Sequence, residues 1–323
     1  YAGSWLESSG AVYAENQALQ WVASLANFPA ASAGVFVSGG TAGNLSALIA
    51  ARWRWRQNGK GSYDRVRPII VTSSGAHSSV GLAANAMDAD IVKVKADAKG
   101  RMSGVNLRQA IAELDAQDRN RICAIVATSG TTNLGVIDDL VAAGEQAREL
   151  GTWFHVDGAY GAAALCAPSV KHLFVGIEKA DSFIVDPHKW LFAPFDACAL
   201  IYRAPENGRN AHTQHGEYLE VLNHSGEFNP SDYGFNLTRR VRGLPLWFSM
   251  ASHGAELYRQ AIAANVELAH QIAQEISSRS YLKLVRDPQL SVVVFEREGW
   301  DLSDYEAWSE KLLSDQFAFV VPS

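Results

Sequence analysis

The stretch Ala180-Asp181-Ser182-Phe183-Ile184-Val185-Asp186-Pro187-His188-Lys189-Trp190-Leu191 joins a short apolar run to a polar turn. Residues 182–185 have the pattern of a strand that is buried on both faces. Lys189 stands between this run and the bulky apolar group Trp190-Leu191-Phe192. A lysine enclosed in this way is expected to be desolvated, which frees its neutral amine for attack on a carbonyl. An exposed lysine in a turn is the alternative.

Six further apolar runs resemble this one, and helical patterns lie between them. The strand candidates are 34–37, 68–72, 91–94, 122–127, 153–156, 182–185 and 199–202. Apolar residues return every three or four positions in three segments, 42–57, 105–117 and 140–150, which predicts helices there. This alternation predicts an α/β fold with a mainly parallel sheet joined by crossover helices.

The alternation of strand and helix patterns ends after the seventh strand candidate. Residues 207–232 are polar and rich in Gly, His, Asn and Ser, and loops of this length are usually functional. The pattern then predicts one or two long helices, two strands, a helix and a strand-like run at 244–278, 282–285, 291–295, 304–314 and 317–321. We therefore predict a large domain over 1–243 and a smaller α+β domain over 244–323.

Composition excludes several classes of protein. The chain has 323 residues, of which 48% are hydrophobic and 19% charged, so it is neither disordered nor collagen-like nor a disulfide-rich miniprotein. A net charge of −6 gives no basic surface for nucleic acid or for an anionic membrane. The longest uncharged stretch, 16–51, contains Pro29 and four glycines, so it predicts no membrane helix. The expected partners are small molecules and other copies of the chain.

The three cysteines have no metal-ligand spacing. Cys123, Cys166 and Cys198 form no C-x-x-C motif and have no histidine at a suitable distance, so we predict no metal site. We expect them to be buried apolar residues. An odd cysteine count without a signal peptide is typical of a cytoplasmic protein.

A glycine-rich turn follows the first strand candidate. Ser38-Gly39-Gly40-Thr41-Ala42-Gly43-Asn44 opens the predicted helix, where backbone N–H groups and the absence of side chains suit a phosphate group. The turn lacks both the lysine of a P-loop and the G-x-G-x-x-G spacing of a dinucleotide site. A purely structural turn remains the alternative.

An acidic residue ends the fifth strand candidate. In His155-Val156-Asp157-Gly158-Ala159-Tyr160, Asp157 lies where ligands bind in open α/β sheets, just beyond the carboxyl end of a buried strand. A carboxylate held there needs a cationic or hydrogen-bonding partner. The alternative is an Asp that only caps the next helix.

Together the three features predict a site for pyridoxal 5′-phosphate (PLP). Lys189 would hold the aldehyde as a Schiff base, Gly40 and Thr41 the phosphate, and Asp157 the ring nitrogen. A protonated ring nitrogen makes the cofactor an electron sink for a carbanion at the substrate α-carbon.

The sequence also resembles the PLP-dependent group II amino-acid decarboxylases, the family of the aromatic-L-amino-acid, histidine and glutamate enzymes. The most specific match is Asp186-Pro187-His188-Lys189-Trp190. Four further motifs match in order, and they are Ser38-Gly39-Gly40-Thr41, Ala76-His77-Ser78-Ser79-Val80, Ser129-Gly130-Thr131-Thr132-Asn133 and His155-Val156-Asp157-Gly158-Ala159-Tyr160. The resemblance implies the aspartate aminotransferase-like fold (fold type I) and a homodimer with its active sites at the subunit interface. It also implies that the usual member extends beyond both ends of this sequence.

The resemblance implies further roles in the site. His77 would stack on the cofactor ring, and Thr132 and Ala159 would line the ring pocket. His188 and Asp186 would lie beside the phosphate and the lysine, with Lys189, His77 and His188 among the catalytic residues. Many relatives have Asn where Asp186 stands, and a carboxylate repels phosphate unless a proton or cation intervenes. Without the family, His77 reads as a structural histidine.

Tyr218 is the remaining catalytic candidate. The polar stretch 207–232 resembles a mobile catalytic loop, and Tyr218 matches the tyrosine that supplies the proton replacing carbon dioxide. A tyrosine that anchors a surface loop is the alternative. The nearby Arg239, Arg240 and Arg242 either bind carboxylates or, as we expect, have a solvated or interface role.

These residues predict decarboxylation of an L-amino acid to its amine. Trp5, near a pocket aromatic of the aromatic-amino-acid enzymes, favours an aromatic substrate, and glutamate, aspartate and diaminobutyrate remain open. An aldehyde-forming decarboxylase or a transaminase could use the same lysine and aspartate. A truncated homologue that binds cofactor or partner without turnover is the third alternative.

Overall fold

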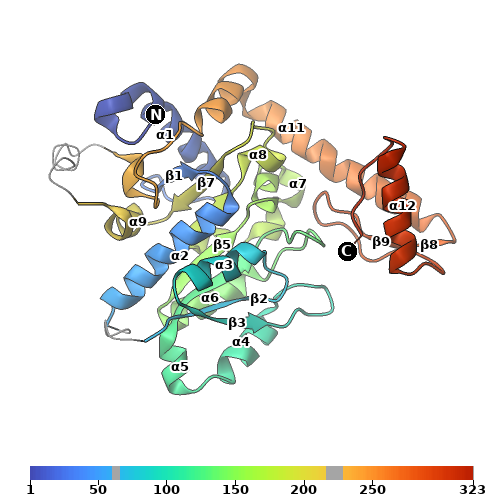
Figure 1. Ribbon diagram of the computed structural model, residues 1–323, viewed down its shortest axis with the longest axis horizontal. Coiled ribbons are helices and arrows are strands. Elements are labelled where there is room, and N and C mark those ends of the chain that lie inside the picture. The colour runs from blue at the N-terminus through green and yellow to red at the C-terminus, as the bar shows by residue number, and fades with distance from the viewer. Residues whose placement is uncertain (60–65, 216–227, 323) are drawn as a thin grey trace.

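A seven-stranded sheet forms the centre of the protein, as seen in a computed structural model that describes residues 1–59, 66–215 and 228–322 (Figure 1). The strand order is β1-β7-β6-β5-β4-β2-β3. The strands are β1 (Ala33–Val37), β2 (Ile69–Ser73), β3 (Asp90–Val94), β4 (Ile122–Thr128), β5 (Trp153–Asp157), β6 (Ser182–Val185) and β7 (Cys198–Tyr202). All seven predicted strands are confirmed to within a residue at either end.

The sheet is mainly parallel, as predicted, with one exception. Strands β2, β3, β4, β5 and β6 pair in parallel, whereas β7 runs antiparallel to both β1 and β6. The connection from β6 to β7 contains only the four-residue helix α8 (Pro187–Trp190). An antiparallel neighbour needs no crossover helix, so this short connection places Lys189 directly at the end of β6.

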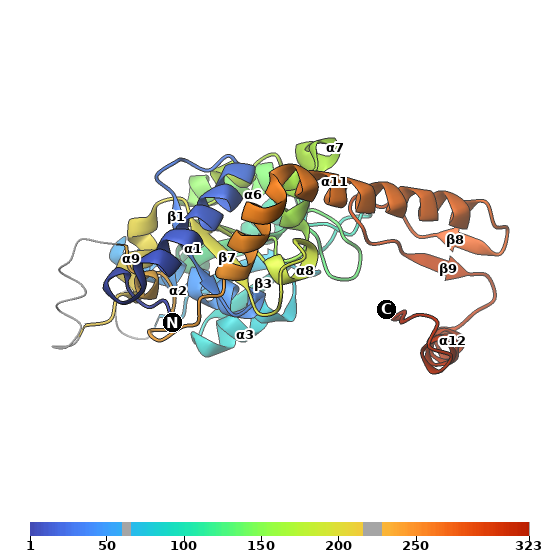
Figure 2. The same ribbon diagram turned by 90° about the horizontal axis from the view of Figure 1, so that it is seen from above.

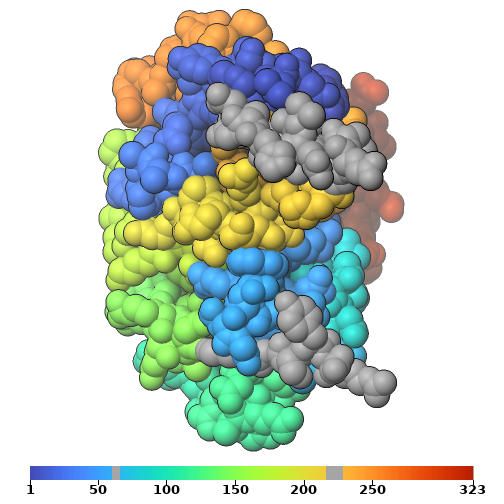
Figure 3. Space-filling view, turned by 90° about the vertical axis from the view of Figure 1, so that its left-hand side faces the viewer, coloured from blue at the N-terminus to red at the C-terminus, as the bar shows by residue number. Residues whose placement is uncertain are grey.

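Helices cover both faces of the sheet, which explains the near-continuous apolar strands. In β4, Ile125 and Ala127 join one buried cluster with α1 (Trp5–Leu25) and α6 (Leu140–Leu150). Ala124 and Val126 face the opposite cluster, which includes α2 (Gly40–Gln57) and α3 (Ser78–Ala86). In the space-filling view the yellow segment that contains α9 (Pro205–His212) lies beside α2 in light blue (Figure 3).

The predicted helices are partly corrected. The segments 42–57 and 140–150 are helical as expected, but 105–117 divides into α4 (Gly104–Ala112) and α5 (Ala116–Arg121). The break occurs because the Asp115 side chain accepts a hydrogen bond from the Asp118 N–H and so begins a new helix. Helices α1 and α3 were not predicted. The remaining short elements are α7 (Pro168–Lys171), η1 (Gly161–Cys166), η2 (His172–Phe174), η3 (Ile177–Lys179) and η5 (Pro230–Asp232).

One long helix leads to the C-terminal elements. The 34-residue α11 (Leu244–Ser277) has a kink at Gly254, whose φ of 73° suits a residue without a Cβ. It carries a hairpin of β8 (Leu282–Leu284) and β9 (Phe295–Arg297), followed by α12 (Leu302–Ser314), at the end away from the large sheet (Figure 2). The predicted strand 291–295 is wrong except at Phe295.

The run 317–321 is also wrong as a strand prediction. Its apolar residues pair with no strand of the described chain, and Phe317 and Phe319 are exposed. The prediction of α12 is confirmed, with its start two residues earlier than 304. Asp301 and Asp304 form a capping box there, which fixes the beginning of the helix.

A buried ion pair joins α1 to the segment before α11. The Arg239 guanidinium donates to both Glu15 carboxylate oxygens at 2.7 and 3.0 Å, and each side chain is 1% exposed. Glu15 also accepts from the Gly243 N–H at 2.8 Å. Arg240 and Arg242 both pair with Asp196. The expected solvated or interface role is therefore wrong for Arg239, and all three arginines bind carboxylates of their own chain.

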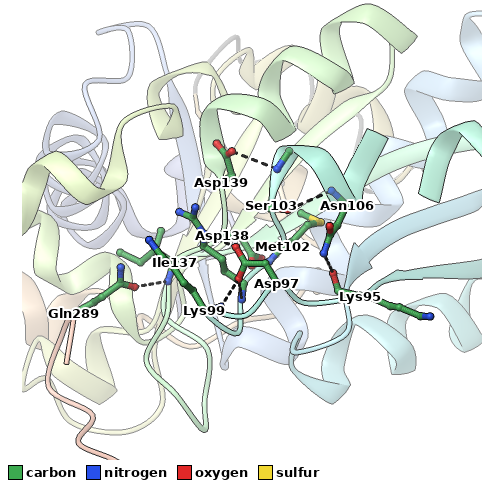
Figure 4. Close-up of polar contacts among 12 residues, drawn as sticks. Lys95, Asp97, Lys99, Met102, Ser103, Asn106, Ile137, Asp138, Asp139 and Gln289 are labelled. Carbon is green, nitrogen blue, oxygen red and sulfur yellow. Dashed lines mark hydrogen bonds and ion pairs between the residues drawn. The ribbon is translucent and has the colours of Figure 1, made fainter. Parts of the chain in front are cut away.

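A second buried carboxylate anchors the turn after β4 (Figure 4). Asp138 accepts hydrogen bonds from the Met102 N–H at 2.6 Å and the Thr128 N–H at 2.8 Å. Burial raises the pKa of Asp138 to about 6. The neighbouring Ile137 N–H donates to the side chain of Gln289, from the segment between β8 and β9. These contacts hold the turn that includes Thr132 from two directions.

The structure also tests the predictions for the cysteines and for a membrane helix. The three cysteines are free and buried, as predicted, and burial raises the pKa of Cys123 and Cys166 to about 12. Within residues 1–59, 66–215 and 228–322, none of the helices combines the length and the apolar character that crossing a membrane requires.

The Arg239–Glu15 pair provides a stability prediction. Arg239→Met leaves the Glu15 carboxylate buried without its cation, so we expect the free energy of unfolding to fall by about 3–5 kcal/mol. Denaturant titration measures this change, with Arg259→Met as the control. Arg259 pairs with Glu256 at the surface, and its loss is expected to cost no more than about 1 kcal/mol. Equal losses in the two variants would contradict the prediction.

Candidate active site

A pocket of about 390 Å³ opens where the carboxyl ends of the central strands meet the first turns of α2, α3 and α8. Its position agrees with the rule that ligands bind beyond the carboxyl ends of strands in open α/β sheets. Its lining consists of Ser38, Gly39, Gly40, Thr41, Ala42, Asn44, His77, Ser79, Thr128, Gly130, Thr132, Asp157, Ala159, Tyr160, Asp186, His188, Lys189 and Phe195. All nine residues predicted to bind a cofactor are in this set.

The glycine-rich turn forms one wall. It connects β1 to α2, and Gly40 is the first residue of the helix. A Cβ on Gly40 would lie 3.1 Å from the Ala159 Cβ and 3.3 Å from Asp186 Oδ2. The Gly40 N–H donates to Asp186 Oδ2 at 3.2 Å. The missing side chain thus lets the turn, β5 and β6 come together around one space.

Asp157 ends β5 and is buried at the pocket. Its Oδ2 accepts from Asn44 Nδ2 at 2.9 Å, and its Oδ1 accepts from the Ala159 N–H at 3.1 Å. Of the two kinds of partner expected for this carboxylate, the structure supplies hydrogen-bond donors. These donors hold the carboxylate in one orientation toward the pocket.

Lys189 is not buried, which corrects the expectation of a desolvated amine. Its side chain is 43% exposed, and Nζ lies 2.9 Å from Asp186 Oδ2. The apolar neighbours do not enclose it, because α8 turns Trp190 into the core and leaves Lys189 on the pocket wall. The fold therefore places this amine at the pocket and leaves it accessible to solvent.

Asp186 is the buried partner of this lysine. Its side chain is 1% exposed, and its Oδ1 has no hydrogen-bond partner in the described chain. His188 Nε2 lies 3.7 Å from the other oxygen. His188 Nδ1 accepts from the Ala197 N–H at 2.9 Å, and the ring makes an edge contact with Phe195. In neutral His188 the hydrogen therefore stands on Nε2, facing Asp186.

His77 has the structural role considered for it, and it also lines the pocket. Its Nδ1 accepts from the Ser79 N–H at 3.2 Å and so caps α3, while the residue lines the pocket. Thr41 and Thr132 are exposed residues on the pocket wall. Tyr218 lies outside the described residues. Trp5, in α1, does not belong to the pocket lining.

Sequence reasoning missed several lining residues. Asn44 and Ser79 stand inside motifs that were singled out, but no role was given to them. The available signal for Asn44 is a polar residue in an otherwise apolar helix turn, where it is completely buried. Tyr160 stacks on Trp190 at 5.0 Å and hydrogen-bonds with Ser291, so a distant segment supports this wall.

His155 lies directly behind the pocket. Its ring is fully buried, with Nδ1 2.8 Å from Ser182 Oγ and Nε2 2.9 Å from Asn44 Oδ1. Burial lowers the pKa of His155 to about 4, although the nearby Asp157 acts in the opposite direction. The ring is therefore neutral at neutral pH.

Comparison with protein families gives one match over most of the chain. Residues 4–298 match the pyridoxal-dependent decarboxylase conserved domain. The chain is 31% identical over 312 residues to the aromatic-L-amino-acid decarboxylase of Bacillus atrophaeus, covering 95% of this chain and 64% of the relative. It is 33% identical to the L-2,4-diaminobutyrate decarboxylase of Rhizobium meliloti, covering 90% and 58%. The chain thus spans less than two thirds of these relatives.

Solved structures have the same architecture. Mouse CSAD superposes with a TM-score of 0.88 at 26% identity, over 100% of this chain and 72% of that one. Oryza sativa TDC with PLP and tryptamine superposes with a TM-score of 0.91 at 23% identity, over 100% and 71%. These likenesses confirm the predicted fold, fold type I.

His155 leads to a pH prediction. Its pKa is about 4 in the folded protein, against the ordinary histidine value of 6.5. Between these values the unfolded chain takes up a proton that the folded chain does not, so stability falls as the pH decreases. The loss is expected to reach about 3 kcal/mol at pH 4.

The measurement compares wild type with His155→Gln by denaturant titration from pH 7.5 to pH 4. Asp138, with its raised pKa, acts with the opposite sign in both proteins and cancels in the difference. We expect the stability advantage of wild type to shrink by about 3 kcal/mol toward acid pH. A constant advantage would show that His155 does not titrate in this way.

Proposed function

Because this chain belongs to the pyridoxal-dependent decarboxylase family, we propose that it decarboxylates an L-amino acid to the corresponding amine with bound PLP. One observation carries the proposal. The accessible amine of Lys189 and the buried carboxylate of Asp157 line the same pocket, beside a glycine-rich turn.

The residues present fit this cofactor. Lys189 offers an amine for the aldehyde, and the absent side chain of Gly40 keeps the wall open for a phosphate. Asp186 Oδ1 and Thr128 Oγ1 are buried polar atoms that have no hydrogen-bond partner in the described chain. Buried polar atoms without a hydrogen-bond partner are typical of a site that a polar ligand completes.

Each proposed contact follows from the chemistry of the residue. Gly40, Thr41 and His188 would hold the phosphate, and Lys189 the aldehyde carbon. Asp157 would hold the ring nitrogen, and the ring itself would lie among His77, Thr132 and Ala159. When bound, PLP supplies an electron sink for the bonds at the substrate α-carbon.

The chain's own groups perform the remaining tasks. The Asp157 carboxylate, fixed by two donors, stabilises a proton on a nitrogen that faces it. Asp186 balances the charge of Lys189 and keeps its ammonium at the pocket. The cation also offsets the repulsion between Asp186 and a phosphate, which is the difficulty raised by an Asp at this position. The walls orient the substrate so that one bond at its α-carbon reacts.

We propose an aromatic L-amino acid as substrate, with diaminobutyrate, glutamate and aspartate as alternatives. The names of the relatives support both an aromatic and a diaminobutyrate substrate. Trp5 gives no support, because it does not belong to the pocket lining. Amine release measured across these amino acids, with aldehyde, peroxide and keto acid as alternative products, separates decarboxylation from the aldehyde-forming and transaminase reactions.

We propose that the chain acts as a cytoplasmic homodimer with active sites at the subunit interface. The negative net charge, the free buried cysteines and the family resemblance support this proposal. We also propose a domain boundary between Gly243 and Leu244, supported by the start of α11 there and by the second sheet at its far end. Sedimentation at several protein concentrations tests the oligomeric state, and limited proteolysis tests the boundary.

Lys189→Ala provides the test of the proposed function. We expect no measurable carbon dioxide release, because no other amine replaces the covalent attachment. In wild type, borohydride reduction with PLP should place the label on Lys189 by peptide mapping. Lys283→Ala, an exposed lysine paired with Glu296, is the control and should keep activity and label. Normal turnover by Lys189→Ala, or a label elsewhere, would contradict the proposal.

We propose Tyr218 as the general acid that protonates the substrate α-carbon, on the sequence match alone. Tyr218→Phe is expected to lower amine yield about 100-fold or to divert the product to an aldehyde, because a positioned acid contributes about 10²–10⁴-fold. Product analysis by chromatography measures the outcome. Tyr13→Phe, an exposed tyrosine on α1, should leave the yield unchanged. An unchanged amine yield in Tyr218→Phe would assign the proton to another group.

A further inference from the structure

A continuous chain of buried hydrogen bonds runs behind the pocket and reaches it at two points. Trp153 Nε1 is 2.9 Å from Ser182 Oγ, which is 2.8 Å from His155 Nδ1. His155 Nε2 is 2.9 Å from Asn44 Oδ1. Asn44 Nδ2 then branches to Asp157 Oδ2 at 2.9 Å and to Ser79 Oγ at 2.8 Å. Ser79 Oγ lies 2.9 Å from His77 Nδ1.

The donor end of the chain leaves the direction open. An indole N–H can only donate, so Ser182 Oγ accepts from Trp153, and the hydroxyl can still either donate to His155 Nδ1 or accept from it. His155 is neutral because burial lowers its pKa to about 4. One of its ring nitrogens therefore donates and the other accepts.

The acceptor end decides the direction. An ionised carboxylate only accepts, so the Asn44 atom facing Asp157 must be the amide nitrogen. The two amide hydrogens are then both used, one by Asp157 and one by Ser79. The Ser79 hydroxyl, which accepts from Asn44, donates in turn to His77 Nδ1. The Asn44 oxygen faces His155, so Nε2–H donates to it, and Nδ1 accepts from the Ser182 hydroxyl.

We propose that Asn44 and His155 are positioning residues that hold Asp157 and His77 as one unit. This inference rests on the proposed function, in which Asp157 meets the ring nitrogen of PLP and His77 meets the ring. Asn44 supplies a fixed donor to the Asp157 carboxylate and, through Ser79, fixes the orientation of the His77 ring. His155 prevents the Asn44 amide from turning over, because the reversed amide would present its NH₂ group to the Nε2–H of His155.

The titratable groups around this unit come from several elements. They are His77 near α3, His155 on β5, Tyr160 after β5, Asp186 at the end of β6, His188 and Lys189 on α8, and Cys198 on β7. Lys189 is paired with Asp186, and Cys198 stays protonated because burial raises its pKa. Asp157 itself receives only the two donors from Asn44 and Ala159 among the hydrogen bonds described.

Asn44→Leu removes the donor to Asp157 while filling the space with a side chain of related shape. Without that donor the carboxylate is no longer held toward the ring nitrogen of PLP, and it stabilises a proton on that nitrogen less well. We expect PLP to bind at least tenfold more weakly and the visible absorption band of bound PLP to move from its wild-type position. Titration of the protein with PLP, followed by visible absorption, measures the affinity and the band position. Affinity equal to wild type, or weaker binding with an unchanged band position, would overturn the proposal.

Ser182→Ala tests the part of the chain that does not touch the pocket. It removes a buried hydroxyl, and Thr72→Val is the matched control because Thr72 is a buried hydroxyl on β2 that donates to the Val126 carbonyl. We expect Ser182→Ala to weaken PLP binding in the same direction as Asn44→Leu, and Thr72→Val to leave it unchanged. Identical behaviour of the two variants would overturn the role of His155. If Asn44→Leu does not fold, this pair decides the question.

The tautomer of His155 provides a readout without cofactor. Nitrogen-15 chemical shifts of the imidazole in cofactor-free wild type, assigned by their loss in His155→Gln, should show the hydrogen on Nε2 at pH 7. A hydrogen on Nδ1 would overturn the proposed direction whatever the enzyme does. Failure of wild type to bind PLP at all would instead count against the proposed function, so the two failures are distinguishable.

Discussion

A buried carboxylate at the end of a strand must be paired, and the structure around Asp157 follows from this constraint. The strand β5 is buried along its whole length, so water does not reach Asp157 from within the sheet. Its donors come from Asn44 on the neighbouring helix α2 and from the backbone of Ala159. Because the glycine-rich turn begins α2, the same helix brings both Asn44 and the open wall of Gly40 to the pocket. The helix that pairs Asp157 with Asn44 therefore also places Gly40 at the pocket.

The second acidic group of the pocket, Asp186, has a different set of partners. It is as deeply buried as Asp157, yet one of its oxygens faces a lysine and a backbone N–H while the other has no partner in the described chain. A buried carboxylate without a nearby cation is strongly destabilising. The lysine is therefore held at the pocket by attraction to Asp186, and its exposed position gives a ligand free access. The burial of Asp186 and the exposure of Lys189 therefore belong to the same ion pair.

Sequence patterns predicted the seven strands and placed Gly40, Thr41, Asp157 and Lys189 in one pocket, because buried strands and strand-end motifs leave short, local signals. The other five predicted cofactor residues came from the family resemblance. Local sequence patterns did not predict that β7 runs antiparallel. Its direction depends on the length and geometry of the turn through α8. The exposure of Lys189 was misjudged for a related reason. Neighbours in sequence do not enclose a side chain when a four-residue helix sends Trp190 and Lys189 to different sides. Partners such as Glu15 for Arg239, or Asn44 for Asp157, are distant in sequence, and only the folded chain reveals them.

The wall that carries Tyr160 is supported from far along the chain. Its hydroxyl bonds with Ser291, its ring stacks on Trp190, and Trp190 donates to Asn265 on α11. Gln289 holds Ile137 beside the adjoining turn. These contacts join the cavity wall to the segment between β8 and β9. A ligand that binds the cavity better when this segment is docked therefore favours docking, and docking favours the ligand by the same factor.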